Sequence, residues 1–112
     1  MTLSSLSRRG EFELLKTQGV RFSKDNLTLV FTSSPTDSVK FAVSTPKKSG
    51  CAVRRNKFRR RARECFRIYS DELICGSYLI AANSSSITMD FRDIVRVLQD
   101  QQSFLKAKRF VR

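Results

Sequence analysis

A dense run of cations between Thr45 and Tyr69 holds the residue types that could do chemistry in this chain. The stretch reads TPKKSGCAVRRNKFRRRARECFRIY, and from Lys47 to Arg67 ten basic residues accompany a single acid, Glu64, for a charge of +9. Arginine outnumbers lysine here, and its planar guanidinium can hold a phosphate through two hydrogen bonds or stack on an unpaired base. These residues therefore predict binding of a polyanion and suit structured RNA. The periodicity does not distinguish RNA from DNA, but neither the helix-turn-helix nor the coiled-coil pattern of a DNA-binding protein is visible.

The candidate RNA-binding residues are the cations of this stretch together with one amide. They are Lys47, Lys48, Arg54, Arg55, Asn56, Lys57, Arg59, Arg60, Arg63 and Arg67. Asn56 has two interpretations that the sequence does not separate. Its amide can meet a phosphate, a 2′-hydroxyl or the water shell of a metal ion, or it can simply belong to the start of a helix, where asparagine is common.

Apolar residues inside the run indicate a helix from about residue 52 to 69. They recur at spacings of four, three and four, which places them on one helical face: Phe58, Ala62, Cys65 and Tyr69. The opposite side gathers polar residues: Asn56, Arg60, Arg63 and Arg67. We expect one face of this helix to pack on a core while the other presents cations on a rigid scaffold.

The rest of the chain predicts a single α+β domain over residues 1–112, an α-β sandwich in the order α-β-β-β-α-β-α. The other elements lie at about residues 8–18, 20–33 with a turn at 24–26, 39–44, 77–82 and 89–102. Ser7 can cap the first helix, and Ser86 or Thr88 the last. Residues 1–6 are expected to be loose, and residues 47–50 to form a flexible basic loop.

Two expectations concern how the strands are arranged. Residues 27–33 and 39–44 are joined by a short turn cluster, SSPTDS, which suggests an antiparallel pair. Residues 39–44, the basic helix and residues 77–82 form a βαβ unit, and such crossovers are right-handed by default. The strand at 27–33 should turn Leu27, Leu29 and Phe31 to one face.

Composition narrows the classes of partner. The chain has 112 residues and a net charge of +12, with a pI near 10.5, which favours nucleic acid and leaves an anionic membrane surface as the other candidate. No stretch approaches the length of a membrane-spanning helix, and the N-terminus lacks the apolar region of a signal peptide. A cytoplasmic location is therefore expected.

Missing residue types limit the chemistry that the chain could perform by itself. There is no histidine, and Cys51, Cys65 and Cys75 show no CxxC spacing, so neither a zinc site nor a histidine-based triad is expected. The ten acidic residues show no metal-binding carboxylate motif, which weighs against a protein-only nuclease. Cys65 is expected to be a core residue, and the catalyst of any associated enzyme to lie elsewhere.

The stretch KKSGCAVRRNKFRRRARECFR resembles the protein subunit of bacterial ribonuclease P. That family carries two lysines, a glycine and then Ala-Val-x-Arg-Asn-Arg-x-Lys-Arg, with arginine and glutamate one turn later. The matching positions are Lys47, Lys48, Gly50, Ala52, Val53, Arg55, Asn56, Lys57, Arg59, Arg60, Arg63 and Glu64. Lys57 stands where arginine is usual and Arg59 where lysine is common, and both keep the charge. Arg61 stands where the family often has an apolar residue, and Ser77 and Asn83 stand where an acid and an arginine are typical.

The resemblance implies a fold like that of a ribosomal-protein domain, with the basic helix in a left-handed crossover. It also implies a role as the protein subunit of an RNA enzyme that hydrolyses precursor tRNA to remove the 5′ leader. The ribonuclease P RNA would carry the catalyst and bind most of the Mg²⁺, with Asn56 as an outer-shell metal contact. The residues expected against that RNA are Lys47, Lys48, Arg55, Asn56, Lys57 and Arg60.

The resemblance further implies a cleft for the single-stranded leader. Phe12 and Val30 would line it, with Arg59 and Arg63 at the rim, and Lys16 lies one helical turn from Phe12. A cationic rim above an apolar floor suits an extended RNA strand. The free protein is expected to be a monomer. The alternative function is that of a structural, ribosomal-type RNA-binding protein with no catalytic role.

Overall fold

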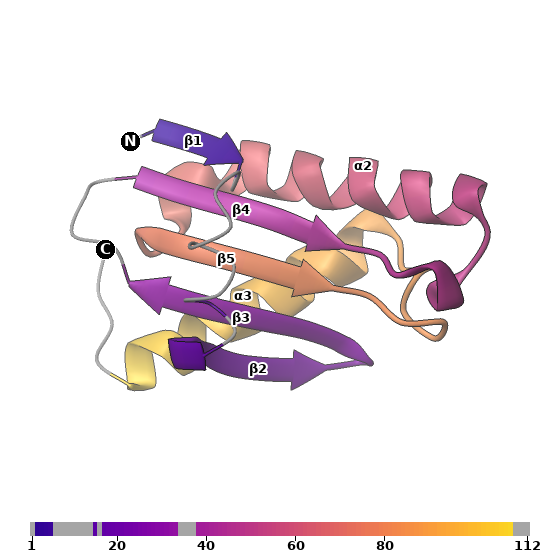
Figure 1. The fold of residues 1–112 in the computed structure, drawn as a ribbon. Coiled ribbons are helices and arrows are strands. Elements are labelled where there is room, and N and C mark those ends of the chain that lie inside the picture. The colour runs from indigo at the N-terminus through magenta and orange to yellow at the C-terminus, as the bar shows by residue number, and fades with distance from the viewer. Residues whose placement is uncertain (1, 6–14, 16, 34–37, 109–112) are drawn as a thin grey trace.

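The computed structural model describes residues 2–5, 15, 17–33 and 38–108 (Figure 1). The elements of this part of the chain are β1 (Thr2–Ser5), β2 (Val20–Lys24), β3 (Leu27–Ser33), β4 (Ser38–Ser44), α2 (Ala52–Tyr69), β5 (Gly76–Ala81) and α3 (Phe91–Ala107). Single 3₁₀ turns lie at Lys47–Ser49 and Ser70–Glu72. Leu15, Thr17 and Gln18 are helical, and the remainder of the first helix expected at 8–18 lies outside the described residues.

A mixed sheet runs through the molecule in the order β1-β4-β5-β3-β2. Its central strand, β5, is parallel to β4 and antiparallel to β3. β2 and β3 form a hairpin, and the expected turn at its tip is confirmed by Asp25 and Asn26, with φ of 54° and 66°. Two successive positive φ values are what a two-residue type I′ turn requires.

Two expectations about the sheet are wrong. Residues 27–33 and 39–44 do not pair, because β5 lies between β3 and β4. Tyr78 and Ile80 on β5 are fully buried, and so apolar a strand belongs where both of its edges are paired. Residues 2–5 are not loose but form β1, parallel to β4, since pairing through the backbone satisfies the edge of β4 without requiring an apolar sequence.

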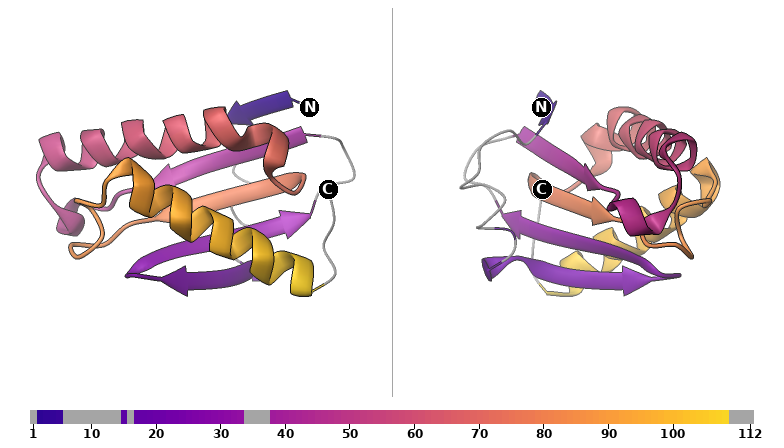
Figure 2. Two further views of the ribbon diagram at one scale, coloured as in Figure 1. Left: turned by 180° about the vertical axis from the view of Figure 1, so that it is seen from behind. Right: turned by 45° about the vertical axis from the view of Figure 1, so that its right-hand side comes forward.

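The connection from β4 through α2 to β5 is left-handed. In Figure 1 both strands run from left to right with β5 below β4, and the two helices lie behind the sheet, as the view from behind in Figure 2 shows. The right-handed default is wrong here, and the crossover that the resemblance implies is confirmed. This face of the sheet carries aromatic side chains that α2 buries, because Phe66 stacks on Phe41 with ring centroids 4.8 Å apart.

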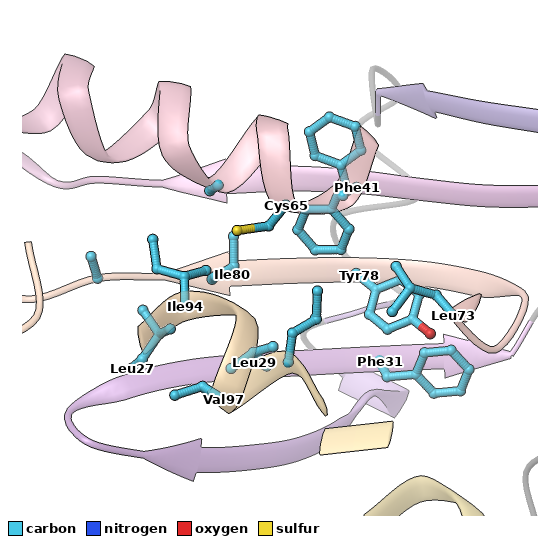
Figure 3. Packing of buried hydrophobic residues seen from close by; sticks show 14 of the residues in the cluster. Leu27, Leu29, Phe31, Phe41, Cys65, Leu73, Tyr78, Ile80, Ile94 and Val97 are labelled. Atoms are coloured by element: carbon cyan, nitrogen blue, oxygen red, sulfur yellow. The ribbon is translucent and has the colours of Figure 1, made fainter. Parts of the chain in front are cut away.

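The main core lies between the sheet and the two helices (Figure 3). Leu27, Leu29 and Phe31 all point into it and are fully buried, which confirms their predicted face. Tyr78 packs against Phe31 with ring centroids 5.0 Å apart. Its buried hydroxyl donates to the carbonyl of Ile74 and accepts a hydrogen bond from the amide of a neighbouring α3 residue, so the polar end of the ring costs little.

Gly76 allows β3 and β5 to approach each other at the start of β5. Its φ is +154°, and a Cβ placed there would lie 2.3 Å from the carbonyl oxygen of Thr32 and 2.5 Å from the Phe31 ring. Any larger residue would push the two strands apart, because the contact on one side is with backbone.

The last helix begins later than expected. Asp90 is the N-cap of α3, and its carboxylate accepts a hydrogen bond from the backbone N–H of Asp93 at 2.9 Å. Ser86 and Thr88 are therefore not the cap. Ser86 instead closes the preceding turn, where its hydroxyl accepts a hydrogen bond from the backbone N–H of Asn83 at 2.9 Å, and it is fully buried.

Candidate nucleic-acid interface

α2 packs on the core through a stripe of buried side chains. The stripe comprises Phe58, Ala62, Cys65 and Phe66. The predicted burial of the first three is confirmed, whereas Tyr69 is half-buried. Burial raises the pKa of the Cys65 thiol to about 12, because an apolar setting disfavours the thiolate. Cys65 is therefore a core residue, as expected.

The cations predicted to bind RNA lie on the remaining surface of α2 and on the turn before it. The exposed ones, with the single amide, are Lys47, Lys48, Arg54, Asn56, Lys57, Arg60, Arg63 and Arg67. Arg55 and Arg59 are half-buried. The structure therefore gathers all ten predicted residues along one rigid segment, which we call the basic face of α2.

Two arginines of the helix are tied to neighbouring elements. Arg59 donates a hydrogen bond from Nε to the hydroxyl of Thr45 at 2.7 Å. Arg61 donates from a guanidinium nitrogen to the carbonyl of Met89 at 3.1 Å, which links α2 to the segment before α3. Arg61, one of the residues that depart from the family pattern, thus has a structural role at the edge of the core.

A third arginine is paired with the acid of the helix. Arg67 donates to both carboxylate oxygens of Glu64, at 3.0 and 2.7 Å. The hydrogen bonds from Arg67 lower the pKa of the Glu64 carboxyl, and the same bonds raise the pKa of Arg67. The fork of Arg67 is therefore already occupied, which distinguishes it from the exposed Arg60.

The segment before α2 is a single 3₁₀ turn and not the expected flexible loop. Ser49 is buried, and its hydroxyl donates to the carbonyl of Pro46 at 2.5 Å, which holds Lys47 and Lys48 in place. Cys51 is the exposed N-cap of α2. The backbone N–H of Arg54 in the first helical turn lowers the pKa of its thiol, since it favours the thiolate.

The residues predicted for the leader cleft are not all brought together. Val30 is buried on the other face of the sheet, where it packs with Leu15, Ala42 and Leu79. Arg59 and Arg63 belong to α2, so the sheet separates them from Val30. Phe12 and Lys16 lie outside the described residues, and the structure gives no placement for them.

The predicted metal contact, Asn56, is exposed in the second turn of α2. Within residues 2–5, 15, 17–33 and 38–108, no group of three histidine, cysteine or acidic residues could hold a metal ion. Among the described residues, Asn56 is therefore not part of a set of protein ligands for direct metal coordination.

A family model described as Ribonuclease P matches residues 2–107. The chain belongs to the Ribonuclease P family. The ribonuclease P protein component of Chloroflexus aggregans is 32% identical over 100 residues, covering 84% of this chain and 74% of the relative. That of Clostridioides difficile is 29% identical over 97 residues, 85% of each chain. A solved Staphylococcus aureus RNase P protein, a mutant with defective mRNA degradation activity, has a TM-score of 0.80 at 20% identity, covering 91% of this chain and 87% of that one.

Ribonuclease P membership and the solved structure confirm the predicted α+β fold. Two residues that support the basic face of this family member escaped the sequence patterns. Thr45 continues the alternation of Phe41 and Val43 along β4, so period-two counting could have placed it toward α2. Phe66 falls beside Cys65 and outside the four-three-four spacing.

Among the described residues, no helix combines the length and the apolar content that crossing a membrane requires.

Proposed function

We propose that the chain assists the RNA subunit of a ribonuclease P in removing the 5′ leader of precursor tRNA. The observation that carries this proposal is the basic face of α2, a rigid segment on which most of the cations are exposed, in a member of the Ribonuclease P family. Rigid cations bind phosphates without the entropy cost that a flexible tail incurs. In this proposal the basic face lies against the ribonuclease P RNA.

The catalyst of the ribonucleoprotein is assigned to the RNA. The chain contains no histidine, and its described residues hold no cluster of metal-ligating side chains, so the protein offers little for hydrolysing a phosphodiester by itself. Mg²⁺ would be bound mainly by RNA phosphates. Asn56, on the basic face, would contact the hydration shell of one such ion.

The leader would follow the sheet face that carries Val30. Val30 and Leu79 give that face an apolar centre. Phe12 and Lys16 are the other leader contacts that we propose, and both lie outside the described residues. Because the sheet separates Val30 from Arg59 and Arg63, a leader that contacts both groups would pass around an edge or an end of the sheet. We place the protein in the cytoplasm as a monomer when it is free of RNA.

The test is cleavage of a precursor tRNA that carries a 5′ leader by a bacterial ribonuclease P RNA at low Mg²⁺, with and without the protein. The protein should permit cleavage under conditions in which the RNA alone is inactive, and Arg60→Ala should reduce this effect. Binding of the RNA with no change in cleavage would instead indicate a structural, ribosomal-type RNA-binding protein.

A further inference from the structure

A groove between α2 and α3 lies on the helical layer, away from the sheet face of Val30. Two cavities of about 340 and 190 Å³ share Tyr69, Val95 and Gln99 in their linings, so they join into one groove. Figure 2 shows the two helices side by side on this face of the sheet. Leu98 is buried beneath the larger cavity and makes its floor apolar.

Aromatic rings form part of the groove walls. Tyr69 comes from the end of α2 and Phe91 from the start of α3, and both are half-buried. Part of each ring is therefore held by packing, while the rest stays open to a ligand. An open ring beside an apolar floor is a platform on which an unpaired base can stack, whereas bases within a double helix are already stacked on one another.

Cations lie along the rim of the groove. Arg92 and Arg96 line the smaller cavity, and Lys106 lines the larger one. In the described part of the chain, neither Arg92 nor Lys106 has an ion-pair partner, and Arg96 has a loose contact of 3.7 Å with Asp93. Phosphates on either side of a stacked base would meet these charges, so the rim is complementary to an RNA backbone.

Polar side chains inside the larger cavity add a preference among bases. Glu72, Gln99 and Ser103 line it, and the ionised carboxylate of Glu72 can only accept hydrogen bonds. Adenine and cytosine each present an amino group on their pairing edge, whereas uracil presents a carbonyl oxygen at the equivalent position. Glu72 therefore favours an amino-bearing base, and its charge disfavours a strongly acidic peptide.

We propose that the larger cavity of this groove binds an unpaired nucleotide of single-stranded RNA, with its base stacked on Tyr69 and its amino group facing Glu72. The cavity volume of about 340 Å³ is at the small end of ligand pockets, which suits one planar base and not a folded peptide. This contact is additional to the basic face of α2. It concerns the chain itself and does not require the tRNA-processing role.

Equilibrium binding of short, fluorescently labelled oligoadenylate and oligouridylate to the purified full chain tests the groove. The basic face of α2 would bind both oligonucleotides through phosphates, so the ratio of the two affinities, compared between the unmodified protein and the groove variants, reports on the groove. We expect oligoadenylate to bind roughly fivefold more tightly or better. Tyr69→Leu keeps an apolar side chain but removes the ring and should abolish the preference, whereas Tyr69→Phe should retain it.

Charge variants provide matched controls. Arg96→Glu should lower the affinity for oligoadenylate more than Lys108→Glu, which changes the net charge equally on an exposed residue outside the groove. Glu72→Gln should reduce the adenylate preference, and because Glu72 is exposed this variant decides the question if Tyr69→Leu fails to fold.

Three results would overturn the proposal. The first is equal affinity of the unmodified protein for the two oligonucleotides, and the second is an unchanged preference in the folded Tyr69→Leu and Glu72→Gln variants. The third is displacement of oligoadenylate by a glutamate-rich peptide that no longer binds the Arg96→Glu variant, which would make the groove a site for an acidic protein. None of these results bears on cleavage at low Mg²⁺, so the two proposals fail separately.

Discussion

Arg59 of α2 and Thr45, the residue that follows β4, are joined by a hydrogen bond of 2.7 Å from the guanidinium Nε to the hydroxyl oxygen. Thr45 is buried and Arg59 is half-buried, so the bond fixes how the arginine leaves the helix. Thr45→Val preserves the shape of the residue and removes the acceptor. We expect it to lower the free energy of unfolding by about 1 kcal/mol, as measured by urea denaturation.

The same variant should weaken RNA binding less than Arg59→Ala does, because the charge remains while its orientation is lost. In a double-mutant cycle, adding Thr45→Val to Arg59→Ala should cost less stability than Thr45→Val alone. Strict additivity of the two substitutions would show that the hydrogen bond contributes nothing.

Arg60 and Arg67 are both exposed arginines of α2, but they should differ in importance for RNA. Arg60→Ala, like Arg55→Ala, is expected to weaken assembly with ribonuclease P RNA by about 1–2 kcal/mol as the loss of a charge-assisted contact. Arg67→Ala changes the net charge by the same amount and should cost less, because Glu64 already occupies the Arg67 fork. Filter binding across a salt series measures both, and equal losses would contradict the distinction.

Gln101 and Gln102 are adjacent buried amides of α3 with opposite expected effects. Neither side-chain amide atom of Gln101 has a hydrogen-bond partner among the described residues, so Gln101→Leu should raise the free energy of unfolding by about 1–2 kcal/mol. Gln102 accepts from the N–H of Ile74 at 2.9 Å and donates to the Tyr78 hydroxyl at 3.2 Å. Gln102→Leu should therefore destabilise by a similar amount. Thermal and urea denaturation of the two variants measure these changes. A change in the free energy of unfolding of the same sign in both variants would contradict the prediction.

The cysteines should react with an alkylating agent at different rates. Cys51 is exposed, and the nearby N–H of Arg54 lowers the pKa of its thiol. Alkylation should therefore begin at Cys51, and its rate should rise with pH at a lower pH than for an ordinary cysteine, because the thiolate is the reactive form. Cys65 is buried with a pKa raised to about 12 and should stay unmodified in the folded protein at neutral pH. Mass spectrometry after timed labelling distinguishes the sites, and equal rates would refute the assignment.

The raised pKa of Cys65 also predicts a loss of stability at alkaline pH. The thiol ionises first in the unfolded chain, so its contribution is complete below the unfolded pKa and disappears as the pH rises toward about 12. Cys65→Ala should lose less stability over that interval than the unmodified protein does.

Local sequence patterns predicted a helix or strand well where its structure depends on its own residues alone. The bounds of α2 follow from a cation run interrupted by an apolar stripe, and the inward face of β3 follows from strict alternation. Asp90 was missed as a cap because Ser86 and Thr88 are equally good cap residues, and the choice depends on how the turn at Asn83 closes.

Arrangement was harder to predict, because it depends on residues far apart in the chain. The sequence of β1 contains no pattern that predicts its pairing with β4. The position of β5 between β3 and β4 depends on how all three strands pair with one another. The groove between α2 and α3 could not be predicted from the sequence for the same reason. Tyr69 and Phe91 line one cavity only because both helices pack on the same face of the sheet.

The central strand of the sheet is also the last strand to be synthesised. β5 pairs with both β3 and β4, so the hairpin of β2 and β3 and the pair of β1 and β4 remain separate pieces until residues 76–81 have left the ribosome. The basic helix α2 is synthesised before β5, so the sheet on which it packs is still incomplete when the helix emerges. Pairings between distant segments form slowly, and the basic face of α2 is consequently held in its final place only after residues 76–81 have joined the sheet.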